Sequence, residues 1–195
     1  MLGIIGGTGL GEALFGDVKG EDRIIDTPFG RPSSAIRVVE WHGLKAALLA
    51  RHGDGHVLNP SQVPYRANIY ALKSLGVTQI LASGAVGSLR EEIRPRDLVI
   101  VDQVIDKTSR RIPTFFDEGL AVHAEFAEPF CPELRRRLIV AAEKVEAMVH
   151  PKGTYICMEG PAFSTVAESR MHREWGGDLI GMTCMPEAKL AREAE

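Results

Sequence analysis

Near its start the chain reads Leu2-Gly3-Ile4-Ile5-Gly6-Gly7-Thr8-Gly9-Leu10, and this stretch decides the fold. A short apolar run bounded by glycines predicts a buried strand that ends in a tight turn. The backbone N–H groups of such a turn can converge on an anion, and Thr8 adds a hydroxyl donor. The same glycines also fit a plain strand-to-loop turn, so the motif alone leaves both interpretations open.

Farther along the chain, short apolar runs alternate with longer amphipathic stretches, which predicts strands alternating with helices in one sheet. We expect strands at residues 2–5, 46–50, 79–83, 98–101, 154–158 and 179–182. We expect helices at residues 66–75, 133–148, 166–175 and 186–195. Ser164 or Thr165 can cap the third helix, with Glu168 completing a capping box. The segment 105–132 mixes basic residues, prolines and phenylalanines, and is expected to be a long ordered loop.

Composition limits the class of protein. With 195 residues and 45% hydrophobic content, the chain can bury one sizeable core, so one domain over residues 1–195 is expected. A formal net charge of −3, with Lys and Arg scattered, indicates neither a nucleic-acid nor a membrane partner. The sequence has no signal-peptide pattern and no apolar run of the roughly 20 residues that span a bilayer. Three separated cysteines suit reduced thiols, so we expect a cytoplasmic protein without disulfides or structural zinc.

Two further strand ends carry residues suited to binding an anion. Arg51 and His52 follow one predicted strand; arginine offers a planar fork of donors, and the histidine can share the anion or a sugar hydroxyl. Ser83, Gly84 and Ala85 follow another, where small side chains let the backbone approach a ligand. Ligands of open α/β sheets bind beyond the carboxyl ends of strands, so three such ends indicate one site. The alternatives are a surface ion pair, a satisfied histidine and tight loop packing.

Two better-known sites fit the sequence poorly. The dinucleotide-binding fingerprint, read from Gly7, puts Glu12 where a third small residue belongs, which argues against a Rossmann dehydrogenase; the lysine of a P-loop is absent. His52 and His56 have a spacing that can indicate a metal, but the glycines between them argue for a loop and no third ligand is evident. We expect no metal and no organic cofactor.

Together the motifs resemble those of the 5′-methylthioadenosine phosphorylases, a branch of the trimeric purine nucleoside phosphorylase family. The resemblance covers essentially the whole chain. The motifs that carry it are Ile4-Ile5-Gly6-Gly7-Thr8-Gly9-Leu10, Asp26-Thr27-Pro28-Phe29-Gly30, Arg51-His52-Gly53, Tyr65-Arg66-Ala67-Asn68-Ile69, Gly87-Ser88-Leu89-Arg90-Glu91-Glu92, Ala127-Glu128-Pro129-Phe130-Cys131-Pro132, Glu159-Gly160-Pro161 and Gly181-Met182-Thr183. It implies an α/β fold in which a mixed central β-sheet is flanked by helices, as in nucleoside phosphorylases.

The resemblance also implies roles for individual residues. The phosphate ligands that it implies are Thr8, Arg51, His52, Ala85 and Thr183. The nucleoside contacts that it implies are Met182 along the ribose, Phe163 on the purine, and His123. In the family the position of His123 reaches across a subunit boundary to close the neighbour's 5′-substituent pocket, so a homotrimer is expected.

Two features depart from the family pattern. Gly84 stands where many methylthioadenosine enzymes carry a threonine near the ribose, so that contact is missing or supplied by Ser83 or water. The chain ends at Glu195, before the acidic Thr-Asp-x-Asp segment that binds the purine in the family and before its C-terminal helix. We therefore expect a domain that is incomplete at its C-terminus, with the purine-binding aspartate beyond Glu195.

The implied reaction is the phosphorolysis of 5′-methylthioadenosine to adenine and 5-methylthioribose 1-phosphate, in purine and methionine salvage. Inorganic phosphate is the co-substrate. Cleavage of the N-glycosidic bond builds positive charge on the ribose, which an anion held at C1′ stabilises. The alternatives are a 6-oxopurine nucleoside or methylthioinosine phosphorylase, a nucleosidase that uses water, and a non-catalytic nucleoside-binding module.

Overall fold

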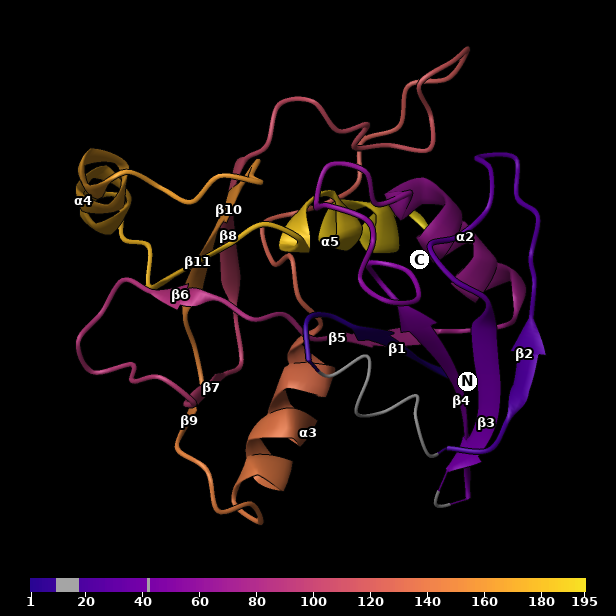
Figure 1. Ribbon diagram of the computed structural model, residues 1–195, viewed down its shortest axis with the longest axis horizontal. Coiled ribbons are helices and arrows are strands. Elements are labelled where there is room, and N and C mark those ends of the chain that lie inside the picture. Colours follow the sequence, from indigo (N-terminus) through magenta and orange to yellow (C-terminus); the bar gives the residue numbers. More distant parts are fainter. Residues whose placement is uncertain (10–17, 42) are drawn as a thin grey trace.

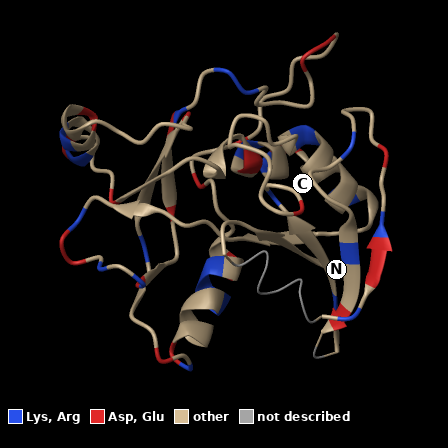
Figure 2. Ribbon diagram, in the orientation of Figure 1, with Lys and Arg blue, Asp and Glu red and all other residues tan. Residues whose placement is uncertain are grey.

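The structure is a computed structural model that describes residues 1–9, 18–41 and 43–195. Two β-sheet regions lie side by side, with helix α5 (Cys184–Glu193) between them (Figure 1). Acidic and basic residues are interspersed over both regions (Figure 2). Within the described part of the chain, no helix has the length and apolar character needed to cross a membrane.

The larger sheet has five strands and is mixed, as predicted. Its members are β1 (Leu2–Gly6), β2 (Glu21–Arg23), β3 (Ile36–Trp41), β4 (Leu44–Ala50) and β5 (Gln79–Ala82), in the order β2-β3-β4-β1-β5. Strand β1 lies between β4 and β5 and pairs in parallel with both, whereas β2, β3 and β4 pair antiparallel. The carboxyl ends of β1, β4 and β5 therefore meet at one edge of the sheet.

Both faces of the larger sheet bury apolar side chains, because successive residues of a strand point to opposite sides. Ile5 and Leu49 face a core that includes α2 (Tyr65–Ser74) and Leu190 of α5. Ile4 and Leu48 contribute to a second cluster on the opposite face. Two helices thus cover one face of the sheet directly beside the strand ends.

The remaining strands form two smaller sets, where we expected a single sheet. A four-stranded sheet has the order β6-β11-β10-β8 and consists of β6 (Gly87–Ser88), β8 (Gln103–Lys107), β10 (Thr154–Met158) and β11 (Leu179–Gly181). A separate pair joins β7 (Leu98–Val99) to β9 (Val149–His150). Met185 of α5 packs on Tyr155 and Cys157 of β10, so α5 contributes to the cores of both the five-stranded and the four-stranded sheet. The predicted α/β class with a mixed sheet flanked by helices is confirmed.

Local predictions were partly right. Strand β10 has the predicted bounds, and the predicted capping box is present where Thr165 and Glu168 bond reciprocally at the start of α4 (Val166–Glu174). In α5, Met185 has extended dihedral angles (φ −116°, ψ 138°), so the regular helix starts at Pro186, as predicted. Pro fits this first helical position because its N–H is not needed there.

Three predictions need correction. The helix expected at 133–148 is α3 (Pro132–Ala142), which ends early because it buries no residue and residues 149–150 pair with β7. The loop expected at 105–132 begins later, because β8 extends to Lys107. Strands β2, β3, β6, β8 and β9 were not predicted.

Candidate active site

The ends of β1, β4 and β5 meet, as the sequence predicts. The Arg51 N–H donates to the Gly6 carbonyl at 3.0 Å, and the Ser83 N–H donates to the Ile5 carbonyl at 3.0 Å. The Gly7 N–H donates to the Ser83 hydroxyl at 3.3 Å. These bonds continue the sheet past its strands and place Gly7 between Arg51 and Ser83.

Gly7 lies at a crowded point of this edge. A Cβ atom at this position would lie 2.6 Å from the Ser83 carbonyl oxygen, 2.7 Å from Arg51 Nη1 and 3.2 Å from Gly84 Cα. Atoms at such distances overlap, so any side chain would force the strand ends apart. Glycine is needed here for close approach of the backbone.

Arg51 lies under the strand ends in a buried ion pair with Glu187 of α5. Its Nε and Nη2 atoms each donate to one carboxylate oxygen at 2.8 Å, and Nη1 donates to the Ser83 carbonyl at 2.6 Å. The two side chains are only 2% and 7% exposed. Burial alone would lower the pKa of Arg51, but attraction to Glu187 and the hydrogen bonds to it outweigh burial and raise that pKa. The predicted alternative of a surface ion pair at Arg51 is therefore wrong.

His52 is buried next to Arg51 and is held in one tautomer. Its Nδ1 atom lies 2.7 Å from the Leu58 carbonyl oxygen, which can only accept, so Nδ1 carries the proton. The other ring nitrogen, Nε2, is then an acceptor. The ring stacks on His56 with 4.2 Å between centroids. Burial lowers the pKa of His52 against the opposing effect of the Leu58 hydrogen bond, which favours the neutral ring at pH 7.

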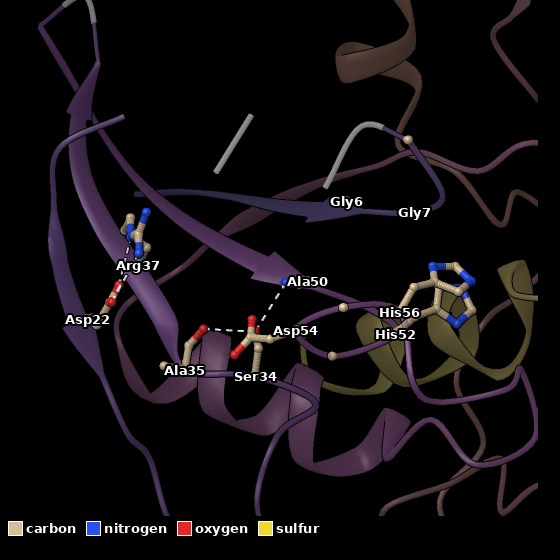
Figure 3. Close-up of a pocket in the computed structure, with 13 residues that line it drawn as sticks. Gly6, Gly7, Asp22, Ser34, Ala35, Arg37, Ala50, His52, Asp54 and His56 are labelled. Atoms are coloured by element: carbon tan, nitrogen blue, oxygen red, sulfur yellow. Dashed lines mark hydrogen bonds and ion pairs between the residues drawn. The ribbon is translucent and has the colours of Figure 1, made fainter. Parts of the chain in front are cut away.

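A cavity of about 430 Å³ opens beside the glycine turn (Figure 3). Gly6 and Gly7 line one side of it and His52 and His56 another, and Ser34 and Ala50 complete this part of the lining. Its charged lining consists of Arg37, Asp22 and Asp54. Arg37 pairs with Asp22 at 2.7 Å. Small polar groups and backbone therefore dominate the wall nearest the strand ends.

The end of β11 lies against this edge as well. Thr183 is the second residue after β11 (Leu179–Gly181), and its hydroxyl oxygen is 3.7 Å from the position that a Cβ atom of Gly84 would occupy. Met182 packs closely on Gly160, where a Cβ atom would meet the Met182 sulfur at 2.6 Å. Four strand ends therefore surround Gly7 and Gly84.

Arg111 holds the turn around Thr183 and was not predicted as a site residue. The Arg111 side chain is 2% exposed and pairs with Glu159 at 3.2 Å. Its Nη1 atom donates to the carbonyls of Met182 and Met185, on either side of Thr183. Glu187 was also missed, since an acidic residue in the first turn of a helix usually indicates a favourable helix-dipole interaction and no more.

The remaining predicted residues lie farther out. Thr8 and Ala85 are exposed beside Gly7 and Gly84, where they can contact a ligand from solvent. Phe163 is 88% exposed on the loop between β10 and α4. His123 is exposed on the segment between β8 and α3, which extends away from both sheets (Figure 1). Both side chains are exposed in this chain, and their roles stay predictions.

Comparison with known proteins agrees with this architecture. The family model of the phosphorylase superfamily matches residues 1–195. The S-methyl-5′-thioadenosine phosphorylase of Synechocystis sp. is 52% identical over 199 residues, which cover 100% of this chain and 60% of that protein. The enzyme of that name from Thermofilum pendens is 52% identical, with 99% of this chain and 73% of that protein covered.

Solved structures show the same fold. Methylthioadenosine phosphorylase from Schistosoma mansoni, in complex with tubercidin, superposes with a TM-score of 0.93 at 40% sequence identity, covering 99% of this chain and 76% of that one. The chain thus spans between 60% and 76% of the length of these proteins. It belongs to the phosphorylase superfamily.

Proposed function

We propose that the protein cleaves 5′-methylthioadenosine by phosphorolysis and releases adenine and 5-methylthioribose 1-phosphate. The observation that carries the proposal is the meeting of four strand ends around Gly7 and Gly84, beside a cavity lined by backbone and by His52. The relatives named S-methyl-5′-thioadenosine phosphorylase support the substrate.

In the proposed site, phosphate lies over the glycine turn. Thr8, Ala85 and Thr183 contact it from three strand ends, and Arg51 and His52 from the fourth. Because the His52 Nδ1–H group donates a hydrogen bond to the Leu58 carbonyl, Nε2 can accept a hydrogen bond from monohydrogen phosphate or from a sugar hydroxyl. The ribose lies along Met182 and the purine against Phe163.

The phosphate attacks C1′ of the ribose as the bond to the base breaks, and the electron pair of that bond leaves with the base. The proton that monohydrogen phosphate gives up is taken by the departing base, which becomes adenine. The ribose carries positive charge in the transition state, and the adjacent anion stabilises it. The site positions the nucleophile, and this positioning removes most of the entropic cost of bringing two molecules together. We propose that no metal or organic cofactor takes part, that the protein is a cytoplasmic homotrimer of purine and methionine salvage, and that His123 contacts a neighbouring subunit's pocket.

The test is base release from methylthioadenosine, adenosine and inosine, each with and without phosphate. Phosphate-dependent release of adenine from methylthioadenosine is the expected result. Equal release without phosphate would instead identify a hydrolase, and preference for inosine would identify a 6-oxopurine enzyme.

A matched pair of variants tests where phosphate binds. Thr183→Val removes a hydroxyl that makes no capping hydrogen bond, so the fold should survive while the KM for phosphate rises. Thr78→Val makes the same change at an exposed residue that directly precedes β5, at the end of that strand away from Ser83. It should leave the KM for phosphate unchanged. Equal kinetics in the two variants would show that phosphate binds elsewhere.

A further inference from the structure

We infer that Glu187 is a positioning residue for the phosphate site, and that it acts through Arg51. The inference rests on the proposed function, because it concerns the same site. Glu187 belongs to the first turn of α5 and is 136 residues from Arg51 in the sequence. Only the fold brings the two together.

The geometry of the pair leaves Arg51 little freedom. Two parallel hydrogen bonds of 2.8 Å join the guanidinium to both oxygens of Glu187. Such a bidentate pair fixes the plane of the guanidinium as well as its position. With both side chains buried, water cannot replace either partner.

The position of Arg51 is passed on to the neighbouring strand ends. Arg51 Nη1 donates to the Ser83 carbonyl at 2.6 Å, and the Ser83 hydroxyl accepts from the Gly7 N–H. Nη1 would also be the second nearest atom to a Cβ at Gly7. Glu187 therefore sets the distance between β4, β5 and the glycine turn.

The pair also directs the unused donors of Arg51. Within the described part of the chain, its hydrogen bonds use three of its five N–H groups. One N–H on each of Nη1 and Nη2 is left for another acceptor. Because the carboxylate fixes the guanidinium plane, it also fixes the direction of these two donors, which a phosphate oxygen at the strand ends can accept.

The same helix start also follows a predicted phosphate ligand. Thr183 directly precedes α5, so Glu187 and Thr183 are joined by a single turn of chain. Arg111 fixes the carbonyls on either side of Thr183. A change at Glu187 therefore disturbs the phosphate side of the site, whereas the Met182 side chain keeps its packing on Gly160.

The test compares Glu187→Gln with a matched control on the same helix. Glutamine keeps the shape but removes the charge and places an NH₂ group against an arginine N–H. Lys189→Met is the control, because it breaks the ion pair of Lys189 with Asp106 without touching Arg51. The measurements are the KM values for phosphate and for methylthioadenosine, and the binding of inorganic phosphate by calorimetry.

We expect Glu187→Gln to weaken phosphate binding about tenfold or more, which is the loss of roughly one charge-assisted hydrogen bond, with the KM for methylthioadenosine unchanged. Lys189→Met should change neither. The inference is wrong if Glu187→Gln binds phosphate like the wild type, or if both KM values rise together, as a general loss of structure would cause.

If Glu187→Gln does not fold, Glu187→Asp decides the question. It keeps the charge but retracts the carboxylate by one methylene, so it should fold and still bind phosphate more weakly than the wild type. Unchanged phosphate binding by this variant would overturn the inference. The proposed function is judged separately: wild-type protein that binds phosphate without releasing base contradicts the function and not the role of Glu187, and wild-type protein that binds no phosphate contradicts both.

Discussion

Replacing Gly7 by alanine tests the packing of the strand ends directly. The added Cβ would lie 2.6 Å from the Ser83 carbonyl oxygen and 2.7 Å from Arg51 Nη1. Neither neighbour can retreat easily, because the first is backbone paired to β1 and the second is held by Glu187. The strand ends must therefore move apart to admit one methyl group.

The cost follows from measured cases of overpacking, in which one added group destabilises a folded core by about 1–3 kcal/mol. For a chain of this length, each kcal/mol lowers Tm by about 2–4 °C, so we expect a decrease of roughly 2–12 °C. The displaced turn should also bind phosphate less tightly. The assay is thermal unfolding followed by circular dichroism, with and without phosphate.

Gly84→Ala is the matched control on the neighbouring strand end. Only the Thr183 hydroxyl lies within 4 Å of its added Cβ, at an ordinary contact distance of 3.7 Å. We expect its stability to stay within about 0.5 kcal/mol of the wild type. If Gly7→Ala unfolded at the wild-type temperature and gained as much stability from phosphate, the reasoning from close packing would be refuted.

Other predictions concern stability around the site. Arg111→Met should lower the free energy of unfolding, measured in urea, by about 3–5 kcal/mol, because it leaves a carboxylate and two carbonyls without their buried cation. A loss no larger than that caused by replacing an exposed arginine with methionine would contradict this. The pKa of Glu159 is lowered to about 2, because hydrogen bonds from Ser61 and backbone amides outweigh burial. The ionised Glu159 carboxylate therefore stabilises the fold fully above about pH 4.5, and this stabilisation is lost as the pH falls towards 2. In Glu159→Gln the acid-unfolding profile should be flatter over that range. The pKa of His52 is lowered from 6.5 by burial, so the unfolded chain binds more protons and stability should fall as the pH drops below about 6.5, an effect that His52→Asn should remove. Thr165→Ala removes the α4 cap and should cost about 1 kcal/mol in thermal unfolding, whereas Thr165→Ser should not.

Local patterns in the sequence predicted the parts of the fold that depend on local causes. Strand β10 lies between Gly153 and Glu159-Gly160 and is buried at its centre, so an apolar run with sharp ends identified it. The glycines after β1 and β5 indicated close approach of backbones, which the contacts of Gly7 bear out. The capping box of α4 was visible because its two partners are three residues apart.

The patterns failed where tertiary structure decides. In β3, Ile36 and Val39 are buried on opposite faces of the sheet, so the strand does not show the apolar–polar alternation of a half-buried strand. In α3, helix-forming residues continue past Ala142, but no residue of this helix is buried and nothing favours its extension. The pairing of Arg51 with Glu187 could not be predicted either, because it spans 136 residues and neither residue shows a local sign of burial.

The charges of the residues around the cavity affect how well a bound phosphate can act as a nucleophile. The cation of Arg51 is neutralised by Glu187, and the cavity lining adds Arg37 against two carboxylates. With His52 held neutral, the described residues at this edge supply no surplus positive charge. Attraction for an anion must then come from directed donors of the backbone, of hydroxyl groups and of the neutralised Arg51 pair, which can bind phosphate without cancelling its charge. A lysine of the P-loop kind would bind the anion more strongly but would also reduce the negative charge that the ribose needs beside it in the transition state.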